Sequence, residues 1–147
     1  MKRKDIEDTA APRMIDLPRN GDSRGNLSFI EGDRHIPFKI VRTYWIYDVP
    51  GGETRGGHAY RTNEEFIVAL SGSFEIVLDC GRGEQVFSLN RSYYGLYVPR
   101  MVWREMKNFS TNSLALVLSS THYDETDYIR DHDTFLHLIG REAVNEQ

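Results

Sequence analysis

Turn signals recur along most of this chain at intervals of about eight to twelve residues, and they leave room only for short strands. The segments between the turns are rich in β-branched and aromatic residues, which favour strands, as in the sequence IVRTYWIYD at 40–48. We expect strands at 26–30, 40–48, 65–70, 74–78, 85–89, 93–98, 102–106 and 113–119. This pattern is typical of an all-β sandwich or barrel.

The last third of the chain has a different pattern. Apolar residues stand among charged ones between residues 124 and 139, which indicates one or two short helical turns packed on the barrel. Gly140 is a candidate for the cap that ends this helical segment. We therefore expect a flexible N-terminal tail at 1–13, one folded domain at 14–140 and a C-terminal tail at 141–147.

Composition and charge argue against several classes of protein. Hydrophobic residues make up 39% of the 147 residues, which suits a globular core and not a disordered chain. The formal net charge of −4 argues against a nucleic-acid or membrane-surface partner, since both select basic faces. A small anionic ligand needs only a few local arginines. The single cysteine, Cys80, has no partner for an intrachain disulfide, so we expect a cytoplasmic protein.

Two spaced motifs in the middle of the chain resemble those of the cupins, which are jelly-roll barrels also described as double-stranded β-helices. The matching positions are Gly52, His58, Glu65 and Gly72 in the first motif and Gly95, Pro99 and Asn108 in the second. Tyr60 and Arg104 stand where cupins commonly carry two further histidines. The resemblance implies an all-β cupin jelly-roll barrel, here with a short C-terminal helical segment.

The cupin motifs ordinarily supply three histidines and a glutamate to a metal ion, and this chain lacks two of the histidines. Arg104 stays protonated, offers no lone pair and would repel a divalent cation. Only His58 and either Glu64 or Glu65 remain, which is too small a ligand set. We therefore predict a site that holds no metal.

Alternation along a strand predicts which side chains enter the barrel. If His58 points inward, Tyr60 and Thr62 do too, whereas Ala59 points outward. The mouth of the barrel then holds an imidazole, a phenol and, from Arg104, a guanidinium. That set can move protons and stabilise a developing oxyanion, so His58, Tyr60 and Arg104 are the candidate catalytic residues.

A closer resemblance rests on longer stretches. The most specific is the run Tyr-Asp-Glu-Thr-Asp-Tyr-Ile-Arg at 123–130, and further stretches lie at 22–27, 36–38, 42–48, 55–59, 70–73, 95–98 and 102–106. Together they make the chain, from residue 14 to residue 138, similar to one cupin subfamily. These are the dTDP-4-keto-6-deoxyglucose 3,4-ketoisomerases, also called WxcM-like proteins.

This resemblance implies an activity and a set of residues. Members convert a dTDP-linked 4-keto-6-deoxyhexose to the 3-keto form through an enediol or enediolate, for the synthesis of deoxyamino sugars. They use no metal or other cofactor and are typically homodimers. His58 corresponds to the expected acid and base, while Tyr60 and Arg104 depart from the histidines that members commonly carry. The expected substrate-binding residues are Arg24, Arg42, Tyr44, Arg55 and Tyr97.

Two other functions stay open. A cupin that binds a sugar nucleotide without turning it over would explain the loss of two motif histidines. A sugar-nucleotide 3,5-epimerase shares the barrel and the substrate class, but that family uses a His–Asp pair that the sequence does not reveal. We rank the epimerase below the other two.

Overall fold

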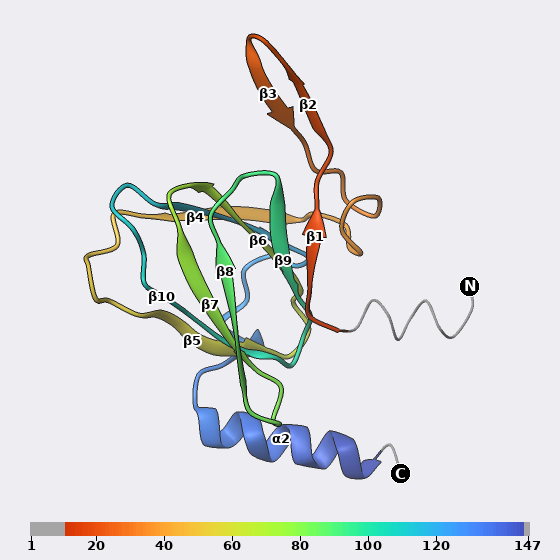
Figure 1. Ribbon diagram of the computed structural model, residues 1–147. Coiled ribbons are helices and arrows are strands. Elements are labelled where there is room, and N and C mark those ends of the chain that lie inside the picture. Colours follow the sequence, from red (N-terminus) through yellow and green to blue (C-terminus); the bar gives the residue numbers. More distant parts are fainter. Residues whose placement is uncertain (1–10, 146–147) are drawn as a thin grey trace.

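The fold is built from two antiparallel sheets that pack against each other (Figure 1). The computed structural model describes residues 11–145, with side chains up to residue 140. The first sheet consists, in spatial order, of β1 (Arg13–Asp16), β9 (Tyr94–Val98), β6 (Glu65–Ser71), β11 (Leu114–Ser119) and β4 (Arg42–Tyr47). The second consists of β12 (Tyr128–Ile129), β5 (Arg55–Tyr60), β10 (Trp103–Lys107), β7 (Phe74–Asp79) and β8 (Glu84–Leu89). The predicted all-β jelly-roll architecture is confirmed.

Alternation along the strands places the core between the two sheets. In β11, Ala115 and Val117 are fully buried in the central cluster, whereas Leu116 faces the other side of its sheet. The eight strands predicted from the sequence are all present, and their ends differ from the prediction by no more than two residues. Seven of these strands belong to the two sheets, whose other three members, β1, β5 and β12, were not among the expected strands. Hydrophobic periodicity therefore located most of the strands that form the barrel.

The N-terminal part of the chain differs from the prediction at one position. β1 begins at Arg13 and pairs with β9, so Arg13 belongs to the first sheet and not to the tail expected at 1–13. Residues 1–10 lie outside the described part of the chain. The strand expected at 26–30 is β3 (Gly25–Ser28), which forms a hairpin with β2 (Arg19–Asp22) that projects from the barrel (Figure 1).

The C-terminal helix is longer than predicted. The segment forms a short 3₁₀ turn, η1 (Glu125–Asp127), then β12, and then a single helix, α2 (His132–Asn145). Asp131 caps its start, because its carboxylate accepts the backbone N–H of Thr134 at 2.9 Å. Gly140 does not end the helix, since an interior glycine costs only about 1 kcal/mol and Arg-Glu-Ala follows it. The expected tail is thus helical to residue 145, and residues 146–147 lie outside the described part.

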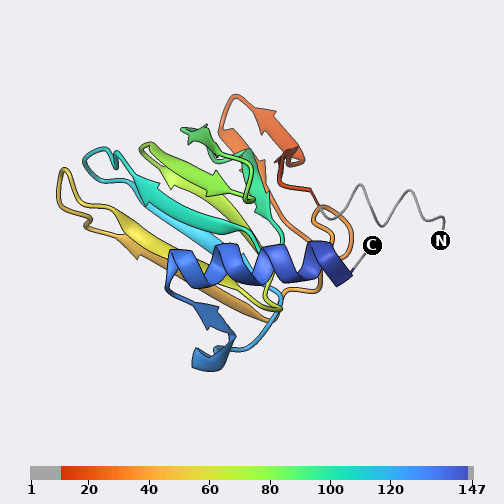
Figure 2. The same ribbon diagram turned by 90° about the horizontal axis from the view of Figure 1, so that it is seen from below.

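Helix α2 supports the strands that carry the candidate site. It lies across the outer face of the second sheet (Figure 2). Phe135 is fully buried there against Ala59, Trp103 and Ile129. The helix therefore covers the back of β5 and β10, whose opposite face looks into the barrel. Neither helical segment among residues 11–145 is long and apolar enough to cross a membrane.

Candidate active site

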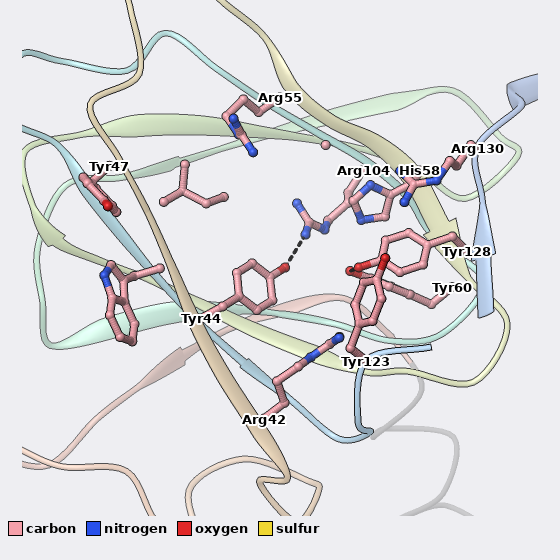
Figure 3. Close-up of a pocket in the computed structure, with 13 residues that line it drawn as sticks. Arg42, Tyr44, Tyr47, Arg55, His58, Tyr60, Arg104, Tyr123, Tyr128 and Arg130 are labelled. Carbon is pink, nitrogen blue, oxygen red and sulfur yellow. Dashed lines mark hydrogen bonds between the residues drawn. The ribbon is translucent and has the colours of Figure 1, made fainter. Parts of the chain in front are cut away.

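A cavity of about 560 Å³ opens between β4 of the first sheet and β5 and β10 of the second (Figure 3). The segment that contains η1 and β12 forms one of its sides. Most of the side chains around it are arginines and tyrosines. The polar and aromatic lining residues labelled in the figure are Arg42, Tyr44, Tyr47, Arg55, His58, Tyr60, Arg104, Tyr123, Tyr128 and Arg130.

His58 and Arg104 sit opposite each other on the paired strands β5 and β10. His58 and Tyr60 both line the cavity, and Ala59 packs on the reverse face under α2, as the alternation predicted. Thr62 is a correction to that prediction. It follows the end of β5, is exposed, and donates its hydroxyl to Asp127 at 2.9 Å.

A buried ion pair lies between the sheets beside the cavity. Nε of Arg104 is 2.7 Å from Oε1 of Glu65, and the two side chains are 2% and 1% exposed. The hydroxyl of Tyr44 accepts a hydrogen bond from Nη2 of Arg104 at 2.8 Å (Figure 3). The same hydroxyl donates to Oε2 of Glu65. Tyr60 and Ser119 also donate to that oxygen, at 3.3 and 3.4 Å. The guanidinium is thus held at a fixed position and orientation.

The protonation states of this network follow from its burial. Burial alone would lower the pKa of Arg104, but the Glu65 carboxylate outweighs that effect and raises the pKa above its ordinary value. Burial raises the pKa of Tyr60 and of Tyr44, and the negative charge of Glu65 adds to both shifts. Arg104 therefore remains a cation, and both phenols remain protonated hydrogen-bond donors.

The ion pair also explains why these residues do not suit a metal. Glu65, a candidate ligand in the sequence, is already engaged by Arg104 and Tyr44. The carboxylate of Glu64, the other candidate, accepts the hydroxyl of Tyr97. Among the described residues, no group of three or more His, Cys, Asp or Glu side chains is arranged to hold a metal ion. A fixed guanidinium occupies the corner where a cupin metal would need ligands.

His58 is enclosed by aromatic rings. It is 8% exposed, and its imidazole lies 4.9 Å from the ring of Tyr60 and 5.1 Å from that of Tyr128, measured between centroids. Its Nε2 is buried and has no hydrogen-bond partner among the described residues. Buried histidines with a structural role normally have such a partner, and a nitrogen without one is open to a bound molecule.

The charge state of His58 is set by its surroundings. Burial lowers its pKa from 6.5 to about 3, and the positive charges of Arg104 and Arg130 contribute to the same shift. The imidazole is therefore neutral near neutral pH, which is the form that accepts a proton.

Three further arginines stand around the mouth of the cavity. The Arg42 guanidinium lies 5.7 Å from the ring centroids of both Tyr44 and Tyr123, and its Nε is buried without a hydrogen-bond partner among the described residues. Arg130 lies 4.3 Å from the ring centroid of Tyr128. Arg55 is exposed. Positive charge at the mouth favours an anionic group there.

Sequence reasoning missed the residues that bring the 123–130 segment to the cavity. The Asp127 carboxylate accepts three hydrogen bonds, from N and Oγ1 of Thr62 at 2.8 and 2.9 Å and from N of Asn63 at 3.1 Å. The Asn63 amide oxygen accepts the backbone N–H groups of Ser120 and Thr121 at 3.1 and 3.2 Å. The sequence run at 123–130 indicated the family, but it did not indicate that this segment lines the cavity. In the structure, the segment 123–130 places Tyr123, Tyr128 and Arg130 along the cavity, with Tyr128 beside His58.

Two predicted substrate-binding residues do not line the cavity. Tyr97 is buried on the opposite face of the first sheet, packed near Phe38, and donates its hydroxyl to Glu64. Arg24 lies in the exposed turn of the β2–β3 hairpin, where it pairs with Asp22 at 2.7 Å. The structure brings together the other predicted site residues, which are Arg42, Tyr44, Arg55, His58, Tyr60 and Arg104.

Comparison with known families accounts for this arrangement. The family model described as "FdtA: WxcM-like, C-terminal" matches residues 10–140, which is nearly the whole chain. This chain belongs to the WxcM-like family. The resemblance of the sequence to that family is thereby confirmed.

Characterised WxcM-like relatives are similar along most of their length. A TDP-4-oxo-6-deoxy-α-D-glucose-3,4-oxoisomerase from Aneurinibacillus thermoaerophilus is 43% identical, over 88% of this chain and 93% of that protein. A 3,4-ketoisomerase structure from Helicobacter canadensis has a TM-score of 0.85 at 40% identity, covering 88% and 97% of the two chains. The sugar 3,4-ketoisomerase QdtA from Thermoanaerobacterium thermosaccharolyticum, solved with TDP, has a TM-score of 0.87 at 37% identity, covering 89% and 96%.

The lowered pKa of His58 gives a direct test of the site. A group whose pKa falls from 6.5 to about 3 stays neutral as the pH drops through the ordinary histidine range. We expect the Cε1 proton resonance of His58 not to shift between about pH 5 and 8. The signal is assigned by its absence from the spectrum of His58→Asn. A titration midpoint near the ordinary value would contradict the burial and charge environment described here.

Proposed function

We propose that this protein is an isomerase that moves the carbonyl group of a TDP-linked 4-keto-6-deoxyhexose from C4 to C3. One relative that matches nearly its full length is named as a TDP-4-oxo-6-deoxy-α-D-glucose-3,4-oxoisomerase, and two others are named as 3,4-ketoisomerases. The observation that carries the proposal is a neutral, enclosed His58 opposite a fixed Arg104 cation in a cavity of suitable size. A cavity of this volume lies within the range of small-molecule sites.

His58 acts on the carbon-bound proton. The neutral imidazole removes the proton from C3, and the electron pair of that bond forms a C3–C4 double bond while the carbonyl oxygen becomes an enediolate oxygen. A proton then moves from O3 to O4, and His58 returns a proton to C4 as the carbonyl forms at C3. The net change moves one hydrogen from C3 to C4 and one from O3 to O4.

Arg104 and Tyr60 act on the oxygens. The enediolate carries a negative charge that the substrate lacks, and a cation fixed in advance stabilises it more strongly than the ground state. Nη1 of Arg104 is buried and has no hydrogen-bond partner among the described residues, so it is available to an oxygen of the intermediate. Tyr60 is a protonated phenol beside His58, which suits it to donate to O4 rather than to act as a base.

The arginines at the mouth bind the nucleotide end of the substrate. A diphosphate is an anion with several acceptor oxygens, which the forked donors of arginine match well. Arg42 has a buried Nε without a partner among the described residues, and Arg55 and Arg130 stand near it around the opening. This division places the phosphates outside and the keto sugar inside, next to His58.

The competing functions fit the geometry less well. In a binding protein without catalysis, nothing would require a neutral imidazole and a fixed cation next to each other. An epimerase of the 3,5 class would need His58 to pair with an aspartate. The His–Asp pair found among the described residues is His132 with Asp79, at 2.9 Å, and neither residue lines the cavity.

Replacement of His58 tests the proposal. With dTDP-4-keto-6-deoxyglucose, the wild-type protein should produce new 3-keto signals in the proton NMR spectrum, in the presence of EDTA because no metal is needed. His58→Asn should lose activity by at least about a hundredfold, the usual contribution of an acid–base group. Tyr97→Phe is the matched control, since Tyr97 is outside the cavity, and it should retain activity. Binding of the sugar by wild-type protein without any new signal would support the binding-protein reading instead.

We also propose that the protein is a homodimer through the outer face of the first sheet. Trp45 of β4, Leu116 of β11 and Val68 of β6 are register partners in one row across that face. Trp45 and Leu70 are exposed, and a hollow of about 740 Å³ beside them has an apolar floor. Tyr93 lines this hollow, whereas Tyr94, the other half of the aromatic pair in the sequence, packs into the core. An apolar surface of this kind marks an interaction site.

Light scattering after size-exclusion chromatography tests the dimer. Trp45→Glu places a charge at the exposed end of the row that forms the proposed contact and should shift the protein from dimer to monomer. Val86→Glu is the control, because Val86 is exposed on the edge strand β8 of the other sheet and should leave the dimer intact. A monomeric wild-type protein, or equal masses for the two variants, would contradict this contact.

The 3-keto product suggests the place of the enzyme in metabolism. A ketone at C3 is the group on which an amino group can be installed, so we propose that the product leads to a 3-amino-3,6-dideoxy sugar. We also propose the cytoplasm as its location, because its substrate is a nucleotide-linked sugar. The identity of the enzyme that consumes the product and cell fractionation test these two statements.

A further inference from the structure

Tyr128 is a half-buried side chain that forms one wall of the pocket around His58. It lies on β12, paired with Tyr60 of β5, so that the two phenol rings stand 4.8 Å apart between centroids. The imidazole of His58 is in contact range of both rings (Figure 3). The Tyr128 ring also contacts two further side chains. Its centroid lies 4.3 Å from the Arg130 guanidinium and 5.9 Å from the ring centroid of Tyr123.

The groups that surround His58 offer few destinations for a proton. Arg104 and Arg130 are cations and cannot accept one. The Tyr60 phenol is already protonated, and its pKa is raised above the ordinary value mainly by burial. The Glu65 carboxylate, which accepts a hydrogen bond from Tyr60, is engaged by Arg104 and Tyr44. With the imidazole 8% exposed and a sugar seated over it, the carbon of the substrate is the acceptor that remains.

We propose that Tyr128 closes His58 off from water, so that the hydrogen removed from C3 is the same hydrogen that reaches C4. This inference rests on the proposed ketoisomerase function and adds a positioning residue that the sequence did not indicate. It also fixes a stereochemical feature, because one imidazole that keeps its proton delivers it to the face of the ring from which it came.

The step balances without any further reactant. The C3–H bond breaks and an N–H bond forms on His58, while the electron pair enters the enediolate. The N–H bond then breaks as a C4–H bond forms, and the imidazole returns to its neutral state. The hydroxyl proton that moves from O3 to O4 travels separately and exchanges with solvent.

The charges around His58 make the shield necessary. Burial, together with the positive charges of Arg104 and Arg130, makes the imidazolium acidic, so near neutral pH it would lose its proton to solvent that reached it. Transfer to C4 without loss therefore depends on a physical barrier, and the rings of Tyr60 and Tyr128 are the barrier that the structure provides. Of the two, Tyr128 is the one without a hydrogen bond to Glu65, so its removal leaves the Arg104–Glu65 ion pair in place.

The experiment follows deuterium from C3. TDP-4-keto-6-deoxyglucose labelled with deuterium at C3 is converted in ordinary water, and the early product is trapped by borohydride reduction. Mass spectrometry and NMR then give the fraction that carries deuterium at C4. We expect more than half of the early product from the wild-type enzyme to keep the label. The reverse run, with unlabelled substrate in heavy water, needs no variant and should give early product with hydrogen at C4.

Three variants separate shielding from a general structural role. Tyr128→Phe keeps the ring and should keep the label. Tyr128→Ala opens the wall, and we expect the retained fraction to fall severalfold even where product still forms. Tyr47→Ala removes another ring of the cavity, one that has no ring contact with His58, and should keep the label whatever its effect on KM.

The outcomes are distinct. Product that carries solvent hydrogen at C4 in the wild-type enzyme overturns this inference and leaves the proposed function intact. If Tyr128→Ala retains the same fraction of deuterium as the wild-type enzyme, Tyr128 does not shield His58. If the wild-type protein forms no product, the proposed function fails and the inference falls with it.

Discussion

The buried ion pair between Arg104 and Glu65 is the interaction on which the arrangement of the cavity depends. Two charges with almost no exposure are stable inside a protein only when they are paired and hydrogen-bonded. Here Tyr44 joins both partners, and Tyr60 adds a donor to the carboxylate. The strands that contribute these residues are thereby locked in one register. The pair acts through specificity of geometry more than through net stability.

The same cation determines the chemistry of its neighbour. Arg104 stands opposite His58 on the adjacent strand and helps to keep the imidazole neutral, after the larger effect of burial. It is also the group best placed to stabilise negative charge on a bound sugar. An arginine in place of a motif histidine thus disfavours a metal and provides a fixed positive charge instead. In the proposed enzyme, the cupin barrel keeps His58 as the acid–base residue, and a fixed charge takes the place of a metal ion.

The sequence predicted those parts of the site that depend on local pattern. Motif spacing and strand alternation were enough to bring His58, Tyr60 and Arg104 to one face. The same alternation, applied to β9, would have placed Tyr97 opposite Leu96 and Val98, and therefore away from the cavity. The prediction that Tyr97 binds substrate came from the family resemblance and not from strand alternation.

Other features depend on contacts between distant segments, which no local pattern contains. The partnership of Glu65 with Arg104 joins β6 to β10, and Asp127 ties its segment to residues 62 and 63. Arg24 was assigned to the site because its neighbours resemble the family, but the hairpin that carries it projects from the barrel. Helix α2 passes Gly140 because one interior glycine costs only about 1 kcal/mol and the residues Arg-Glu-Ala follow it.

The central claim is that Arg104, held in place by Glu65, stabilises the enediolate, and the double variant Arg104→Met with Glu65→Gln tests it most directly. Both charges disappear together, so neither is left buried and unpaired, and the chain should remain folded. The measurement is kcat and KM for TDP-4-keto-6-deoxyglucose. The account predicts a fall in kcat of about 10²–10³, the usual loss for an oxyanion-stabilising donor, with KM changed far less. A folded double variant with nearly wild-type kcat would contradict it.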